Sequence, residues 1–176
     1  MKSVSKIRRD ISNKLFNESN APGWYIWWFD EDGMKKILQP MIKELELTKI
    51  ARKKIGEKDY YALYFGISKE LKGRIVWHVA QQHTPSTVES SSLSTLRQTL
   101  SALLRLPMTQ SENAVNDFMD KHCVLEYNYC TTLADAQQRE KSTLINGYFP
   151  LNIQSNKGVP KQATSKLTQL RKKYRK

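Results

Sequence analysis

The run Trp24–Phe29, with the sequence WYIWWF, is the segment that most limits how this chain can fold. Aromatic and β-branched side chains favour extended strands, and an unbroken run of them has the composition of a buried strand. Asn20–Gly23 before the run and Asp30–Gly33 after it contain residues that interrupt regular structure. We therefore expect a sheet with this strand in its core.

Two other segments have strand-like patterns, at about Tyr60–Ile67 and His122–Tyr129. Side chains of a strand alternate between its two faces. In the first of these segments, alternation predicts that Leu63, Phe65 and Ile67 share one face and that Tyr60, Ala62, Tyr64 and Gly66 share the other. In the second segment, apolar residues also recur at every other position. The sequence therefore predicts three strands.

Helices are expected where apolar residues recur every three or four positions. Such segments are Lys2–Asn17, Met34 to about Lys54, Lys69–Gln82, about Leu93–Leu104 and Leu133–Gly147. Pro40 should kink or split the second of them. Residues 83–92 are expected to form a polar loop, 109–120 have only a weak pattern, and 150–153 should be extended. The tail, 155–176, is predicted to be disordered or helical only from about Gln162 onward.

The size and composition of the chain are typical of one globular domain. It has 176 residues, of which 39% are hydrophobic and 26% charged. No apolar run approaches the roughly 18 residues of a membrane span, and the basic N-terminus lacks the apolar stretch of a secretion signal. Cys123 and Cys130 have the spacing of neither a disulfide framework nor a zinc site, so we expect both to be reduced. These features predict a cytoplasmic protein.

The chain is strongly basic, with a formal net charge of +12. An excess of this size favours a polyanionic partner, and nucleic acid is the usual one because phosphate contacts supply most non-specific affinity. Residues 155–176 alone contain eight Lys or Arg and no acidic residue. Charge by itself does not distinguish a nucleic-acid-binding protein from a basic protein that associates with ribosomes or with lipid surfaces.

Arg74 and His78 are four residues apart in a predicted helix, so their side chains point the same way. A neighbouring cation lowers the pKa of a histidine and favours its neutral, proton-accepting form. The pair would suit a phosphate clamp next to a proton shuttle. It would equally fit two surface residues on a basic helix.

Glu140 falls within the apolar stripe that Leu133, Ala136 and Leu144 form on one predicted helix. An unpaired buried carboxylate is costly, and a metal ion would compensate for it. Mg²⁺ and Mn²⁺ prefer oxygen ligands, and Mg²⁺ often uses only one or two protein carboxylates. Alternatively, Glu140 lies at the edge of the stripe and reaches solvent or a lysine.

Tyr25 and Tyr64 lie inside strand-like segments, each two residues from a glycine, Gly23 and Gly66. Glycine beside a strand often marks the close approach of another backbone or of a ligand. Aromatic residues in strands are normally core residues, so the pattern alone favours simple packing.

Taken together, these residues resemble a known signature. Gly23-Trp24-Tyr25, Tyr64-Phe65-Gly66, Arg74, His78, Glu140 and Asn152 follow one another in this order. The ordered set resembles that of the GIY-YIG nuclease superfamily and spans about 130 residues, most of the chain. Residues 91–100 also resemble a helix of restriction-endonuclease-like members. Trp24 and Phe65 replace the isoleucines of the family's two namesake triplets, but they remain large and apolar.

The resemblance implies an α+β fold, with a small, mostly antiparallel three-stranded sheet flanked by helices. It divides the chain into an N-terminal helix (1–22), a nuclease domain (23–154) and a basic C-terminal tail (155–176). The gap between the two triplets is longer than in compact members, so residues 31–58 would be a helical insertion that could alter how DNA docks.

The resemblance also implies roles for six residues. Glu140 would hold one divalent ion, Mg²⁺ or Mn²⁺, and Arg74 would bind a phosphate oxygen. The base that activates the attacking water would be Tyr25 itself or His78 acting through Tyr25. Tyr64 would position the water or the phosphate, and Asn152 would orient a neighbouring loop.

The function implied is a metal-dependent DNA endonuclease, of restriction, mobile-element or repair type. A homodimer would supply the two active sites that double-strand cutting generally needs. The alternatives are a non-catalytic nucleic-acid-binding protein that retains the fold, and an RNA-cutting nuclease. The basic residues expected to contact the nucleic acid are Arg97, Arg105, Lys157, Lys161, Lys166, Arg171, Lys172 and Lys173.

Overall fold

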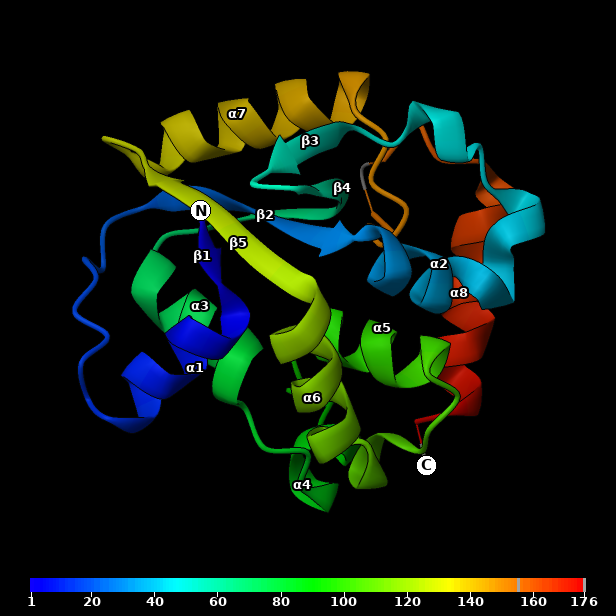
Figure 1. Ribbon diagram of the computed structural model, residues 1–176, viewed down its shortest axis with the longest axis horizontal. Helices are drawn as coiled ribbons and strands as arrows, with labels where there is room; N and C mark the ends of the chain where they lie inside the picture. Colours follow the sequence, from blue (N-terminus) through cyan, green and yellow to red (C-terminus); the bar gives the residue numbers. More distant parts are fainter. Residues whose placement is uncertain (155, 176) are drawn as a thin grey trace.

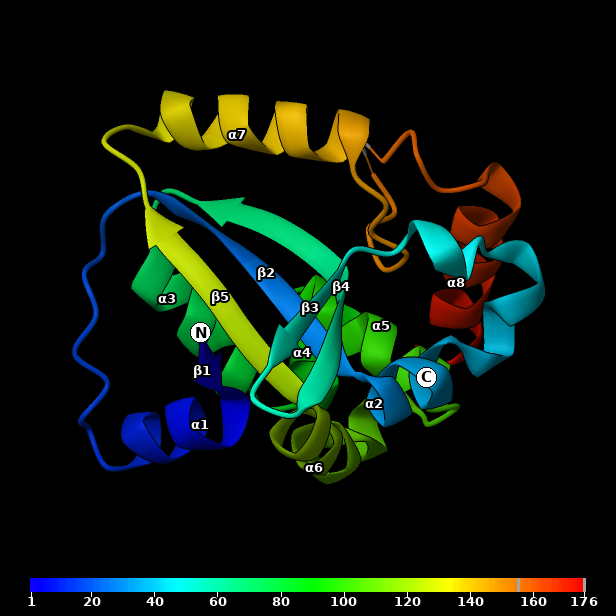
Figure 2. The same ribbon diagram turned by 45° about the horizontal axis from the view of Figure 1, so that its top comes forward.

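The aromatic run forms the central strand of the sheet. The computed structural model describes residues 1–154 and 156–175, and within them five antiparallel strands are ordered β1-β5-β2-β4-β3. These are β1 (Lys2–Ser3), β2 (Gly23–Asp30), β3 (Arg52–Ile55), β4 (Lys58–Ser68) and β5 (Cys123–Tyr129). Strand β2 pairs with β4 on one side and β5 on the other (Figures 1 and 2).

Helices pack on both faces of this sheet. They are α1 (Val4–Ser12), α2 (Glu31–Leu38), α3 (Leu71–Ala80), α4 (Pro85–Glu89), α5 (Thr95–Leu103), α6 (Glu112–His122), α7 (Leu133–Asn146) and α8 (Lys161–Lys173). Short 3₁₀ segments cover Gln39–Glu44, Leu47–Lys49 and Met108–Gln110. Helix α7 lies across one face, and α1, α3, α5 and α6 cover the other (Figure 2).

The two faces have separate apolar clusters. Beneath α7, Leu144 packs with a small group that includes Trp28 and Phe65. The main core lies on the opposite face and is built around Trp27 and Phe29. Val4 and Ile7 of α1 and Ala163 and Leu167 of α8 are buried in the same main core, so both ends of the chain contribute to it. In the part of the chain that the structure describes, no helix is long and apolar enough to cross a membrane.

The expected α+β class is confirmed, but the sheet has five strands rather than three. The two missed strands lie at its edges. Strand β3 falls within the segment predicted to be helical, where only α2 and the 3₁₀ segments Gln39–Glu44 and Leu47–Lys49 are helical. Gly56 adopts a positive φ of 60°, which allows the chain to turn from β3 into β4 as a hairpin.

A β-bulge changes the predicted faces of β4. Trp27 pairs with Tyr64 but Trp28 pairs with Ala62, so the register slips by one residue at Leu63. Leu63 therefore joins the main core on the same face as Tyr64, whereas Ala62 and Phe65 share the α7 face. The simple alternation, which placed Leu63 with Phe65 and Ala62 with Tyr64, was wrong because it assumed a regular strand.

Two segments are more helical than their patterns predicted. Helix α6 covers most of the weakly patterned 109–120, and α4 lies inside the expected polar loop. In the tail, α8 packs on α5 and buries Ala163 and Leu167 in the main core, so the alternative of a helix from about Gln162 onward agrees with the structure and disorder over the helix does not. Residues 150–151, expected to be extended, form a turn, and 152–153 have no regular secondary structure; residues 155 and 176 of the predicted tail lie outside the described residues. The N-terminal helix is shorter than expected, because Ser3 caps it and it ends at Ser12.

Candidate active site

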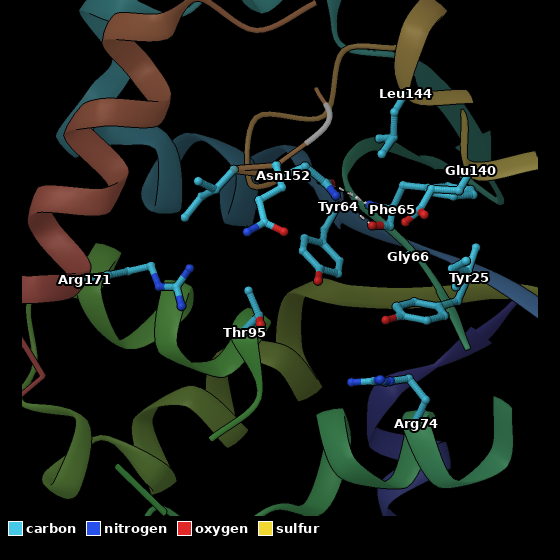
Figure 3. Close-up of a pocket in the computed structure, with 13 residues that line it drawn as sticks. Tyr25, Tyr64, Phe65, Gly66, Arg74, Thr95, Glu140, Leu144, Asn152 and Arg171 are labelled. Carbon is cyan, nitrogen blue, oxygen red and sulfur yellow. Dashed lines mark hydrogen bonds between the residues drawn. The ribbon is translucent and has the colours of Figure 1, made fainter. Parts of the chain in front are cut away.

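A cavity of about 410 Å³ opens between the sheet and helices α3, α5, α7 and α8. Five of the six predicted site residues line it: Tyr25 from β2, Tyr64 from β4, Arg74 from α3, Glu140 from α7 and Asn152 from the loop after α7. His78 lies directly behind Tyr25 and is buried. Thr95 of α5 and Arg171 of α8 complete the polar wall (Figure 3). The fold thus brings together residues that are far apart in the sequence.

The glycines of the two triplets make room for close packing. Tyr25 stands opposite Gly66 in the β2–β4 register. A Cβ on Gly66 would lie 2.5 Å from Cζ of Tyr25, a separation that real Cβ atoms essentially never show. A Cβ on Gly23 would overlap the carbonyl of Asn128 in β5. The absence of a side chain at Gly66 therefore leaves room for the ring of Tyr25, and its absence at Gly23 allows the close approach of β5.

Replacing Gly66 with alanine is expected to lower the free energy of unfolding by about 1–3 kcal/mol, because the Tyr25 ring must move or the backbone must shift. Gly73 provides the matched control: it lies in α3, and a Cβ there would meet nothing within 4 Å. Gly73→Ala should raise stability by about 0.5–1 kcal/mol through helix propensity. Urea denaturation measures both changes, and wild-type stability of Gly66→Ala would contradict the close packing.

A chain of hydrogen bonds runs from the cavity into the core. The Tyr25 hydroxyl lies 2.8 Å from Nε2 of His78, and Nδ1 of His78 lies 2.5 Å from Oγ of Ser94. If the ring proton is on Nδ1, it is donated to Ser94 Oγ, and Nε2 accepts the Tyr25 hydroxyl proton. This is the tautomer that a proton acceptor needs. Ser94 was not among the predicted site residues, although a serine just before a helix is a common N-cap, the position that it occupies here.

His78, the middle residue of this series of hydrogen bonds, is neutral near pH 7. Burial lowers the pKa of His78 to about 3, and the positive charges of Arg74 and Arg97 act in the same direction. Burial also raises the pKa of Tyr25 well above its ordinary value, and Tyr64 adds to the effect while Arg74 opposes it. In the free protein both groups are therefore uncharged near neutral pH, as predicted for His78 from the Arg74 spacing.

The neutrality of His78 predicts how stability depends on pH. An unfolded histidine takes up a proton near pH 6.5, whereas folded His78 resists protonation until about pH 3. Stability is thus full above pH 6.5 and is lost as the pH falls towards 3; at pH 5 the loss is about 2 kcal/mol. His83, whose pKa burial lowers to about 4, acts in the same direction. Urea unfolding between pH 7.5 and 5 measures this slope, and His78→Gln should flatten it.

Arg97 is not a nucleic-acid contact, and that expectation was wrong. Its side chain is fully buried. Nε donates to Nε2 of His83 at 2.7 Å, and Nη1 donates to the carbonyls of His78 and Val79 at 3.1 Å each. Arg97 therefore binds the C-terminal end of α3, where helix carbonyls lack partners, and it fixes the turn that carries His78.

Glu140 is the one acidic side chain among the described residues that line the cavity. Burial raises the pKa of its carboxyl group above the ordinary value, which is the response of a carboxylate without a compensating cation. The described residues contain no group of three or more His, Cys, Asp or Glu that could hold a metal ion. A single carboxylate beside two tyrosine hydroxyls, in a cavity with room for water, fits Mg²⁺ or Mn²⁺ bound mainly through water and substrate oxygens.

Asn152 lines the cavity, but both hydrogen bonds of its side chain go to the backbone of β4. Its Oδ1 accepts from the backbone N–H of Phe65 at 2.9 Å, and its Nδ2 donates to the Phe65 carbonyl at 2.8 Å. This edge of β4 is not covered by β3, whose pairing ends at Tyr61. Asn152 therefore takes the place of a neighbouring strand next to Gly66, in keeping with the loop-orienting role expected for it.

The other basic residues expected to contact nucleic acid have different surroundings. Arg171 lines the cavity itself, and Lys166 forms an ion pair with Glu44 at 2.8 Å. The remaining five, Arg105, Lys157, Lys161, Lys172 and Lys173, are exposed. Helix α8 thus presents cations both inside the cavity and on the surface beside it.

Comparison with known proteins gives one result. A model of the family described as the GIY-YIG catalytic domain matches residues 23–173. That range begins at the first glycine of the motif and extends through helix α8. No match was found among curated proteins or among solved structures.

Proposed function

Because the chain belongs to the family of GIY-YIG catalytic domains, which indicates a nuclease, we propose that it is a divalent-metal-dependent DNA endonuclease. One observation carries the proposal: a single cavity gathers Tyr25, Tyr64, Arg74 and Glu140, with His78 hydrogen-bonded to Tyr25 from behind. A non-catalytic binding domain would have no need to keep a hydrogen-bonded tyrosine–histidine pair in the same cavity as the half-buried carboxylate of Glu140.

Arg74 would bind the scissile phosphate. Its guanidinium lines the cavity and stacks 4.5 Å from the ring centroid of Trp77, which limits the directions in which it can point. A planar guanidinium matches two phosphate oxygens and would stabilise charge that develops on them during in-line attack. Tyr64, whose ring borders Tyr25, would help to position the phosphate or the water.

The geometry favours Tyr25 as the group that touches the attacking water. His78 is buried and does not line the cavity, whereas Tyr25 does. The water would transfer a proton to the Tyr25 oxygen as the phenolic proton moves to Nε2 of His78. Phosphate bound at Arg74 would offset one of the positive charges that lower the pKa of His78, so that the proton is easier to accept. Glu140 would hold the divalent cation, which supplies stabilisation of the negative charge on the leaving oxygen.

The proposal includes restriction-type cutting by a homodimer, in which two copies would act on the two strands. The structure of one chain offers two regions for recognition: the α4 region at 83–92 and the β3 hairpin at 52–58. Both lie outside the cavity wall and carry polar side chains, which suits contacts to bases or backbone.

The direct test is cleavage of supercoiled plasmid DNA, and of RNA in parallel, with Mg²⁺, Mn²⁺ or EDTA. We expect nicked and linear plasmid with either metal and none with EDTA, and discrete fragments if cutting is sequence-specific. No cutting of either substrate would contradict the proposed activity. Cutting of RNA alone would mean that the protein is an RNA nuclease that uses the same site residues.

A further inference from the structure

A second cavity adjoins the candidate active site along helix α8. Its volume is about 320 Å³, and it shares Thr95, Ile153 and Arg171 with the first cavity, so the two lie side by side. Figure 3 shows Arg171 reaching from α8 towards the same hollow that Arg74 enters from α3. Beyond Arg171, the second cavity is lined by Lys172 and Arg175.

The charged side chains that line this second cavity are all positive. Among the residues that the structure describes, its lining contains three cations and no carboxylate. Across residues 1–154 and 156–175, none of the three takes part in an ion pair. Like charges held together in a partly enclosed space repel each other, so an anion bound among them would stabilise the arrangement.

Arg171 is held in place for such a ligand. Helix α8 packs on α5, and Leu167, one helical turn before Arg171, is buried in the main core, so the buried face of α8 also carries Arg171. Its Nη2 donates to Oε1 of Gln98 at 2.7 Å. Gln98 is neutral, so this bond orients the guanidinium without cancelling its charge. Burial lowers the pKa of Arg171; Tyr64 opposes this effect and the nearby Arg175 adds to it.

Resting on the proposed function, we propose that Arg171, Lys172 and Arg175 form a second phosphate subsite. It binds a phosphate of the substrate strand next to the phosphate held at Arg74. The hydroxyl of Ser91 accepts a hydrogen bond from the Arg175 guanidinium and positions it. The strand then runs from Glu140 along α8, so that this helix selects a polynucleotide over a small phosphodiester.

The test measures binding without cleavage. A short fluorescent DNA duplex is titrated with protein in EDTA at several salt concentrations, and the wild type is compared with Arg171→Gln/Arg175→Gln. We expect the double variant to bind about tenfold more weakly, and its plot of log K against log salt to be shallower by about one. Arg9→Gln is the matched control, because Arg9 is exposed on α1, at the opposite end of the molecule from α8 (Figures 1 and 2).

Each outcome separates the inference from the function on which it rests. Wild-type protein that fails to bind DNA would refute the proposed function and the subsite with it. Wild-type binding that the double variant reproduces in affinity and salt slope would refute the subsite alone. Arg175→Gln by itself alters an exposed side chain and should not disturb folding, so a smaller loss in this variant supports the subsite even if Arg171→Gln lowers stability.

Discussion

Glu140→Gln is expected to reduce DNA cleavage by about a thousandfold or more while DNA binding in EDTA stays close to that of the wild type. Glutamine keeps the size of the side chain but removes its negative charge. Glu140 is the one carboxylate that lines the cavity, and burial already raises the pKa of its carboxyl group. The variant therefore loses the only acidic group in the lining that could attract a divalent cation, but it keeps Arg74 and Arg171.

Two measurements separate this effect from general damage. Mn²⁺ binding, followed by its paramagnetic resonance signal, should weaken in Glu140→Gln without any need for turnover. Asp117→Asn removes one exposed carboxylate from α6, outside the cavity and outside both proposed recognition regions, and should leave both cleavage and Mn²⁺ binding unchanged. Cleavage by Glu140→Gln at the wild-type rate would exclude this residue as the metal ligand.

Sequence patterns predicted the helices and strands in which apolar side chains are buried at regular intervals. Trp24–Phe29 forms the central strand because large side chains cover both of its faces. Strand β3 carries Arg52, Lys53 and Lys54 on an exposed edge, so its sequence has no apolar alternation to distinguish it from a helix end. Helix α6 does have a stripe, Val115, Phe118, Met119 and His122, but polar residues between them weaken it.

Site residues that line the cavity were predicted from the sequence, but the contacts of Arg97 and Ser94, which hold His78 in place, were not. The resemblance to the GIY-YIG signature identified five residues that line the cavity, whereas the local pattern at Tyr25 and Tyr64 favoured simple packing. Arg97 was misassigned because its charge was taken as a surface feature, although it is the only charged residue in the stretch from Leu93 to Leu104. Nearly every side of helix α5 is buried, so Arg97 is buried as well. Its guanidinium therefore donates hydrogen bonds to buried acceptors, His83 and the carbonyls of His78 and Val79. The role of Ser94 depends on the packing of α5 against α3, which no local pattern contains.

Tyr25→Phe is expected to reduce cleavage by about a hundred- to ten-thousandfold, the usual contribution of a positioned proton acceptor. Phenylalanine keeps the ring that packs against Gly66 and removes only the hydroxyl that joins the cavity to His78. Tyr64→Phe is the matched control, because Tyr64 lines the same cavity but its hydroxyl is not within hydrogen-bond distance of His78 in the contacts that the structure shows. Tyr64→Phe should lower the cleavage rate by about tenfold or less.

Comparison with His78→Gln then determines whether the two residues act as one unit. If His78 acts only by accepting the Tyr25 proton, the double variant Tyr25→Phe/His78→Gln should cleave no more slowly than Tyr25→Phe alone, because the second change removes a partner that no longer has a hydroxyl to assist. Multiplicative losses would mean that His78 contributes independently of Tyr25. Equal losses in Tyr25→Phe and Tyr64→Phe would refute Tyr25 as the proton acceptor and leave the two hydroxyls with a shared positioning role.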